Sequence, residues 1–267
     1  MLSTRLSKLG AAIVIIFTLV ALFAPLLAPY DPGKINLSGE LEGPSPAHIL
    51  GQDKLGRDIL SRVIYGSRVS LIVGFSVVFV SGFIGIIIGA LSGYKGGAYD
   101  MIIMRIIDIL ISFPGILLAI AITGVMGPSL KNVIFALCVF GWVGYARLVR
   151  GQVLSLRERE YVLSAKALGA KDMYIIFKHI LPNTLSPIIV TATFGIAGVI
   201  LAESSLSFLG LGPQDVPTWG AMLNEGAEYL LFAPHVSIFP GLAIMLTILG
   251  FNFIGDGIRD YFDPKTS

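Results

Sequence analysis

The sequence has little charge for its length. Only 13% of its 267 residues are Asp, Glu, Lys or Arg, whereas 55% are hydrophobic and the mean hydropathy is +0.83. A soluble domain carries about a quarter charged residues, so this chain lacks the charge that a water-exposed surface requires. The shortage excludes a typical soluble enzyme, and the apolar content excludes a disordered chain. What remains is a membrane protein with several spanning segments.

Cysteine and recognisable catalytic motifs are also scarce. Cys138 is the single cysteine, which excludes an internal disulfide and is typical of a small buried apolar residue. The sequence has no G-x-x-x-x-G-K-[ST] phosphate loop, no H-E-x-x-H motif and no cluster with metal-ligand spacing. Its three histidines lie outside or at the edge of the apolar runs, where none could activate an intramembrane serine. We therefore expect no metal, no cofactor and no catalytic residue, and the net charge of +2 gives no reason to expect nucleic acid.

Six apolar stretches are long enough to cross a bilayer, which takes about 20 residues each. They are residues 11–29, 69–91, 101–126, 133–149, 187–206 and 236–254. The prediction is an all-α membrane protein with six transmembrane helices. Because Arg5 and Lys8 precede the first stretch, a cleaved signal peptide is an alternative interpretation of that stretch alone.

The positions of Lys and Arg predict the orientation. Residues 147–178 carry seven basic side chains and residues 207–235 carry none, so the first segment is predicted to be cytoplasmic and the second external. Both termini then lie inside. The segment before the second span disagrees, because it has five basic residues, although acidic residues offset them.

The cytoplasmic segment predicts two short helices, at 157–168 and 171–181. Gly169 suits a left-handed turn between them, and Pro182 is expected to end the second. Apolar side chains of the second helix are expected on one face: Met173, Ile176, Phe177 and Ile180. Such a hairpin could dock a partner protein or lie on lipid headgroups, and the residues alone do not decide between these.

Four motifs, in order, resemble those of permease subunits of bacterial ABC importers, and specifically the C-type subunit of the dipeptide, oligopeptide and nickel importers. EYVLSAKALG with HILPN (160–169, 179–183) resembles the cytoplasmic loop of that family. HILGQDKLGRD with SRVIYGSRVSL (48–58, 61–71) resembles the segment before its second span. SFLGLG with the later WG (207–212, 219–220) resembles its outer loop, and NFIGD (252–256) its C-terminal tail.

The resemblance implies a type I ABC importer transmembrane domain in the inner (plasma) membrane of a bacterium or archaeon. It would be half of a heterodimeric pathway with a second permease subunit, working by alternating access. Two cytoplasmic ATPase subunits would hydrolyse ATP, and an extracytoplasmic solute-binding protein would deliver di- or oligopeptides. Nickel or a metal chelate is the alternative substrate, and a stand-alone channel or a membrane scaffold is the alternative from another class.

The resemblance also divides the chain and assigns an ATPase-coupling loop. An N-terminal part (1–68) would precede a permease core (69–254) that contains the loop (150–186), and a cytoplasmic tail (255–267) would follow. The residues carried over to coupling are Ala165, Leu168, Gly169, Ala170, Met173, Leu181 and Pro182. One position departs from the family motif, because Leu163 stands where an acidic residue is expected and Glu160 lies one helical turn upstream.

Several polar or aromatic residues are candidates for the pathway or gate. Arg105 and Asp108 are spaced to pair on one helix face, either in the pathway or as a structural pair. Glu203 is a candidate outer gate or substrate contact that could instead reach interfacial water, and residues 208–219, from Phe208 to Trp219, are a candidate outer gate and docking surface. Pro114 is expected to kink the third span.

Two further patterns predict packing. Ser81, Gly85, Gly89 and Gly93 form a stripe of small residues that would contact either this subunit or the second permease subunit. Residues 53–68 are predicted to form an external amphipathic helix with ion pairs Asp53–Arg57 and Asp58–Arg62, which either lies on lipid or contacts the solute-binding protein. In the tail, Asp256, Arg259, Asp260 and Asp263 are expected to share one helix face.

Overall fold

The structure is a computed structural model that describes residues 4–262, and the regular elements in this part of the chain are helices. The spanning and flanking helices are α1 (Arg5–Leu22), α2 (Ala24–Leu27), α3 (Ile59–Lys95), α4 (Gly97–Ile111), α5 (Gly115–Met126), α6 (Leu130–Leu156), α9 (Leu181–Phe208) and α11 (His235–Phe262). Shorter elements are η1 (Leu37–Gly39), α7 (Glu160–Ala167), α8 (Asp172–Ile175), the π-helical η2 (Ile176–Ile180) and α10 (Trp219–Ala227). Within residues 4–262, five helices are long and apolar enough to span a membrane, and the bent pair α4–α5 would be a sixth.

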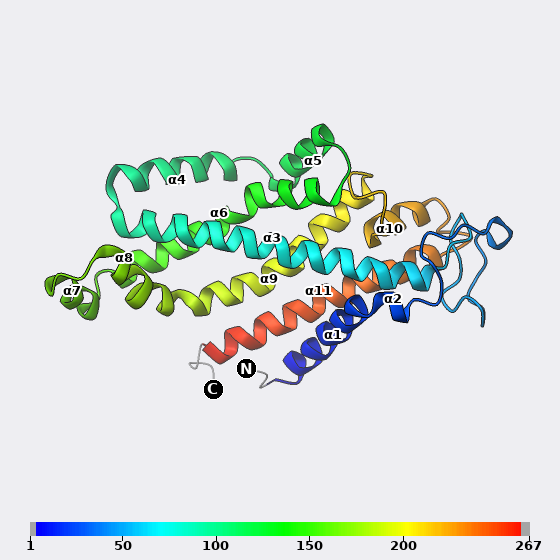
Figure 1. Cartoon of the computed structure of the whole chain (residues 1–267), viewed down its shortest axis with the longest axis horizontal. Coiled ribbons are helices and arrows are strands. Elements are labelled where there is room, and N and C mark those ends of the chain that lie inside the picture. The colour runs from blue at the N-terminus through cyan, green and yellow to red at the C-terminus, as the bar shows by residue number, and fades with distance from the viewer. Residues whose placement is uncertain (1–3, 263–267) are drawn as a thin grey trace.

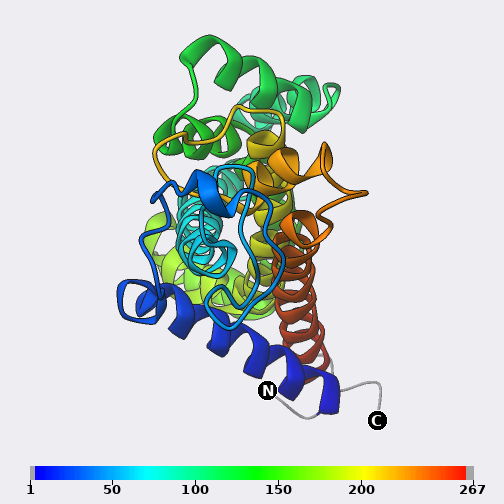
Figure 2. The same ribbon diagram turned by 90° about the vertical axis from the view of Figure 1, so that its right-hand side faces the viewer.

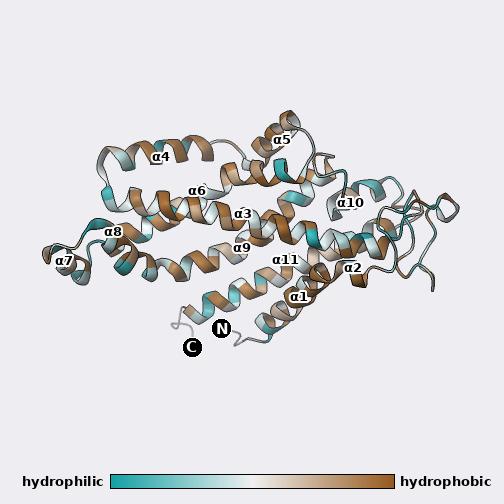
Figure 3. Cartoon of the chain, viewed as in Figure 1, coloured by the Kyte–Doolittle hydropathy of each residue, from teal (hydrophilic) through white to brown (hydrophobic). Residues whose placement is uncertain are grey.

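The helices lie roughly side by side, and the two ends of the bundle differ (Figure 1). The hairpin of α7 and α8 forms one end, whereas α10 and the segment between α2 and α3 form the other. The start of α1 and the end of α11 lie on the side of their helices away from α10 and the segment between α2 and α3. This arrangement agrees with the predicted orientation, in which the loop and both termini are cytoplasmic. The hydropathy colouring shows predominantly apolar helices and more hydrophilic segments at the ends (Figure 3).

Helix α3 is the central element of the bundle. It begins at Ile59, where the Asp58 carboxylate accepts the Ser61 N–H at 2.7 Å, and it ends at Lys95, followed by Gly96 with a φ of +65°. Its stripe of small residues faces α6. A Cβ at Gly85 would lie 2.5 Å from the Trp142 carbonyl oxygen, and one at Gly93 would lie 2.9 Å from the Arg150 carbonyl oxygen. The stripe therefore permits close packing within this subunit, the first of the two interpretations.

The third span is broken rather than merely kinked. Helices α4 and α5 meet at 81° across residues 112–114. Pro114 has no N–H to continue α4, and its carbonyl accepts the Leu117 N–H at 3.0 Å to start α5. The expected effect of Pro114 is thus confirmed, and the break is sharper than a kinked single helix would give.

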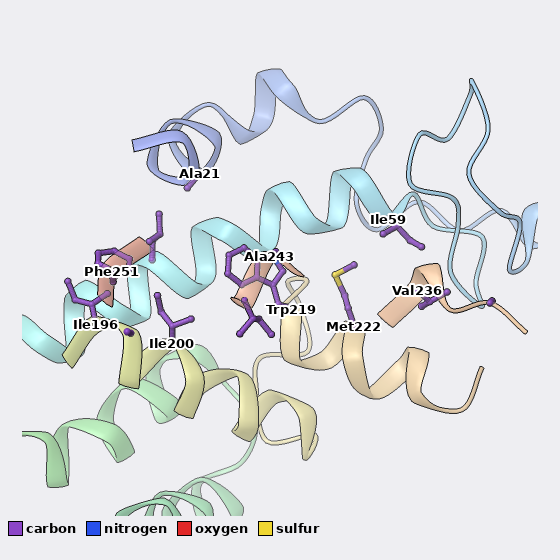
Figure 4. Close-up of a cluster of buried hydrophobic side chains, with 13 residues drawn as sticks. Ala21, Ile59, Ile196, Ile200, Trp219, Met222, Val236, Ala243 and Phe251 are labelled. Carbon is purple, nitrogen blue, oxygen red and sulfur yellow. The ribbon is translucent and has the colours of Figure 1, made fainter. Parts of the chain in front are cut away.

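The core at the external end is built around Trp219. This side chain is fully buried, its indole N–H donates to the Val63 carbonyl at 2.9 Å, and Phe17 of α1 meets its ring edge-on at 5.8 Å. Ile59, Met222 and Val236 belong to the same cluster (Figure 4). The cluster joins α1, α3, α9, α10 and α11 into one apolar unit.

Helix α1 lies at the edge of the bundle and packs along α11 (Figure 2). A Cβ at Gly10 would lie 2.7 Å from the Gly250 carbonyl oxygen, so the two backbones approach closely there. The first span therefore packs as part of the bundle.

At the end of α11, Asp256, Arg259 and Asp260 are exposed, and Asp263 lies outside the described residues.

Candidate functional site

The cytoplasmic hairpin is held by a tight turn at Gly169. Its φ of +81° is the left-handed conformation that glycine adopts without steric cost. The Ala170 N–H donates to the Ala165 carbonyl at 3.1 Å, and the Gly169 N–H donates to the Lys166 carbonyl at 3.0 Å. These two bonds are the Schellman motif that commonly ends a helix. The sequence prediction for Gly169 is confirmed, and the motif gives α7 a defined end.

The hairpin has an anchored side and an exposed side. Val162, Ile175, Ile176 and Ile180 are buried against α3 and α6. The exposed apolar side chains are those of Tyr161, Leu163, Leu168, Met173, Tyr174 and Phe177, a group we call the hairpin surface. Leu168 is 89% exposed. Several exposed apolar side chains on a hairpin that is anchored by buried ones are typical of a protein docking site.

The second half of the hairpin differs from the sequence prediction in two ways. Ile176 and Ile180 are buried while Met173 and Phe177 are exposed, so these four residues do not share one face. The helix also does not end at Pro182, because residues 176–180 form a π turn in which the Leu181 N–H bonds to the Ile176 carbonyl. The wider turn rotates the side chains and places Pro182 in the first turn of α9, where its missing N–H is tolerated. Leu181 is half-buried and Pro182 is exposed.

A buried ion-pair network occupies the external end. Glu225 of α10 accepts hydrogen bonds from Arg57 at 2.6 Å and from Arg62 at 3.1 Å. Asp53 lies 2.7 Å from Arg57 and 3.4 Å from Arg62. Asp53 and Arg62 are almost fully buried. We call these four residues the external clamp, because they join the segment before α3 to α10. The network also explains why basic residues occur on this side of the membrane: two of them are neutralised.

The predicted amphipathic helix at 53–68 is wrong. Helix α3 begins only at Ile59, and both Ile59 and Ile64 are buried in the protein rather than free to lie on lipid. The Asp53–Arg57 pair is confirmed, but the Asp58–Arg62 pair is not formed. Asp58 instead caps α3 and lies 2.9 Å from His48. The error arose because a repeating apolar pattern cannot distinguish a lipid contact from a protein contact.

The candidate pathway residues fall into different environments. Arg105 and Asp108 are both exposed and line a groove with the Asp100–Arg150 ion pair, but they form no ion pair with each other among the described residues. Arg150 contacts Asp100 through two hydrogen bonds of 2.5 and 2.6 Å. Sequence reasoning missed this pair because 50 residues separate its members. A pathway role for Arg105 and Asp108 stays a prediction.

The three outer candidates, Glu203, Phe208 and Trp219, also differ in burial. Glu203 is fully buried, where it accepts hydrogen bonds from Ser207 at 2.7 Å and Ser70 at 3.3 Å, so it does not reach interfacial water. Trp219 is a core residue rather than a gate. Phe208 is exposed and lines a shallow apolar groove with residues of α9, α10 and α11. In this conformation only Phe208 of the three can contact a solute.

Comparisons with known proteins agree with this geometry. Residues 85–267 match the family described as "Binding-protein-dependent transport system inner membrane component", and residues 2–44 match "N-terminal TM domain of oligopeptide transport permease C". A dipeptide transport system permease protein of Alkalihalophilus pseudofirmus is 48% identical over 98% of this chain and 86% of its own length. A glutathione transport system permease protein of Pectobacterium atrosepticum is 50% identical over 94% of this chain and 84% of its own.

A solved structure has the same fold. An inward-facing form of the MetNI methionine ABC transporter aligns with a TM-score of 0.64 at 20% identity, over 77% of this chain and 98% of that one. The matches confirm the resemblance found in the motifs, the importer fold and the placement in the plasma membrane. They also confirm a transport role rather than an enzymatic one. The chain belongs to the family of inner membrane components of binding-protein-dependent transport systems.

Proposed function

We propose that the chain is one of two different permease subunits of an ATP-driven importer of short peptides. The substrate assignment rests on two nearly full-length relatives at 48% and 50% identity, which are named as permeases for a dipeptide and for the peptide glutathione. Family membership implies ATPase, solute-binding and second permease partners in general terms. The proposal makes the membrane part a heterodimer with two ATPase subunits below it.

The hairpin surface would contact an ATPase subunit. It is apolar, exposed, and mounted on buried residues of α7, α8 and η2 that pack against α3 and α6. Leu163 lies in it with 48% of its surface exposed, at the position where the family motif has an acidic residue. The contact at this position would therefore be apolar rather than ionic. Ala165, Leu168, Gly169 and Ala170 would form the turn that enters the ATPase groove.

At the opposite end, the solute-binding protein would dock near α10 and the external clamp. The clamp holds α10 against the segment before α3, so the two present a single surface. The groove beside Phe208 lies next to α10 and could open or close with it. Arg105 and Asp108 would face the aqueous side of the inner half of the pathway, since both are exposed in the single subunit.

The test is uptake by the reconstituted complex of this chain, the second permease subunit, the ATPases and the binding protein in proteoliposomes. Labelled dipeptide and glutathione should accumulate only when ATP is supplied on the ATPase side of the membrane and the binding protein is supplied on the opposite side. Nickel, offered alone or as a chelate, is the competing substrate. Accumulation of nickel without peptide would overturn the substrate proposal, and flux without ATP would favour a channel.

A further inference from the structure

A groove of about 430 Å³ lies between α1 and the outer part of α3. The two helices are neighbours in the bundle, and the outer part of α1 lies beside α3 (Figure 1). Most of the side chains that line the groove are apolar, and several of them are exposed. The lining residues are Thr18, Ala21 and Leu22 of α1, with Arg68, Leu71, Ile72, Phe75 and Ser76 of α3.

Arg68 is the one charged residue in this lining. It is half-buried, and it forms no ion pair or side-chain hydrogen bond within residues 4–262. The external clamp neutralises Arg57 and Arg62 but does not include Arg68. A positive charge on the outer side of the membrane, against the usual distribution, is therefore left without a counter-ion in the described part of the chain.

The place of Arg68 in α3 puts it at the depth of the lipid headgroups. It directly precedes the apolar stretch 69–91, and α3 enters the membrane from the external side. The other α3 residues of the groove follow three, four, seven and eight positions later, so they share one helix face with Arg68 and lie deeper. The groove thus begins at a cation and continues inward as apolar surface.

We propose that this groove binds an anionic phospholipid of the outer leaflet. The Arg68 guanidinium would donate hydrogen bonds to the lipid phosphate, whose oxygens match its planar set of N–H groups. One acyl chain would lie in the groove against Leu22, Ile72 and Phe75. No acidic side chain lines the groove to attract the ammonium group of a zwitterionic lipid, so a headgroup with net negative charge is favoured.

A lipid accounts for both parts of the groove. A free phosphate ion would pair with Arg68 but leave the apolar part uncovered. The second permease subunit would have to bring a carboxylate to the depth of Arg68, whereas phospholipids supply phosphate at that depth throughout the membrane. The volume of the groove also falls within the range of small-molecule sites, roughly 300–1,000 Å³, which is enough for part of one acyl chain.

The bound lipid would help to attach α1 to the rest of the subunit. Only 17% of the apolar window of α1 is buried, against 28% to 39% in the other four long spanning helices. An acyl chain between α1 and α3 would add contacts on the side where α1 has few of its own. Lipid binding is therefore expected to stabilise the assembled protein against heat.

The first experiment measures lipid retention. The importer complex is purified in detergent, delipidated and incubated with phosphatidylglycerol or with phosphatidylcholine of the same acyl chains, and bound lipid is counted by native mass spectrometry. The complex should retain phosphatidylglycerol about tenfold more strongly, the lower end for a hydrogen bond to a charged group. Arg68→Gln should lose this preference, whereas Arg68→Lys, which keeps the charge, should retain part of it. Lys131→Gln is the matched control, because Lys131 is an exposed cation at the outer start of α6 and belongs to no ion pair among the described residues.

The second experiment fills the groove and leaves Arg68 unchanged. Thr18→Trp places a large side chain in the groove, so retention of phosphatidylglycerol should fall and the rise in Tm that this lipid causes should shrink. Ile16→Trp is the control, since Ile16 is exposed on the same helix but does not line the groove. Millimolar inorganic phosphate should not displace the lipid, and displacement would show that the site takes a small anion instead.

Two further results would overturn the inference. If Arg68→Gln retains phosphatidylglycerol as strongly as the unmodified complex, Arg68 reaches interfacial water and the lipid at this surface is not selected. If Arg68→Gln or Thr18→Trp releases the second permease subunit while lipid retention is unchanged, the groove is a contact between subunits. Neither result bears on peptide import, which these experiments do not measure.

Discussion

Neutralising Glu225 tests whether the external clamp stabilises the outer end of the bundle. Its carboxylate accepts hydrogen bonds from Arg57 and Arg62, and Arg62 is almost fully buried. Glu225→Gln keeps the shape but leaves two arginines facing one carboxylate, that of Asp53. Breaking a buried ion pair costs about 3–5 kcal/mol. Because Glu225 is 23% exposed and Asp53 remains as a partner, we expect the lower part of that range, about 3 kcal/mol.

The assay is thermal unfolding of the purified subunit in detergent, followed by intrinsic fluorescence. At about 2–4 °C per kcal/mol for a chain of this size, the Tm should fall by roughly 6–12 °C. Trypsin should also cleave faster at Lys54, because the segment before α3 would detach from α10. Glu228→Gln is the control, since Glu228 is exposed at the end of the same helix and belongs to no ion pair among the described residues.

A rescue variant separates charge from packing. Replacing a buried ion pair with apolar residues of similar volume is often neutral, so Arg62→Met combined with Glu225→Leu should recover much of the lost Tm. If Glu225→Gln lowers the Tm no more than Glu228→Gln does, the clamp contributes no stability and the reasoning is refuted.

Three other substitutions follow from the packing. Gly169→Val forces a β-branched residue into a φ of +81°, which costs about 1–2 kcal/mol of conformational strain. ATP hydrolysis should continue while peptide uptake falls, and equal losses of both activities would contradict a coupling role. Gly89→Leu should lower the amount of protein in membranes, since even a Cβ at this position overlaps the Ala146 carbonyl. Gly144→Leu is the control and should be tolerated, because a Cβ there meets no atom within 4 Å. Arg150→Lys should lower the Tm by a few degrees, because lysine cannot make both hydrogen bonds to Asp100; an unchanged Tm would count against the pair.

The features that could be predicted from the sequence are those that depend on the local residues. Spans follow from apolar length, and the turn at Gly169 and the break at Pro114 follow from the backbone preferences of those two residues. The orientation follows from where lysine and arginine occur. Each of these signals lies within a few residues of the feature that it predicts.

The failures involve contacts between distant segments. The partner of Arg62 lies 163 residues away, so a nearby carboxylate seemed the better candidate. Trp219 and Glu203 looked like gate residues because they are polar or amphipathic near a span end, and only tertiary packing shows that both are buried. The π turn at 176–180 shifts the register by one residue, which no local apolar pattern reveals.

Helices α8, η2 and α9 follow one another without a break and form one helix of 37 residues, Asp172–Phe208. The length of this helix has a mechanical consequence. At 1.5 Å per residue it is about 55 Å long. A tilt of about 10° at the hairpin would therefore displace the far end by roughly 10 Å. The softest part of the rod is the π turn followed by Pro182 and Pro187, close to the point where force would enter. If an ATPase acts on the hairpin as proposed, the stiffness of this short joint would set how much of the movement at the cytoplasmic end reaches Phe208 at the outer end.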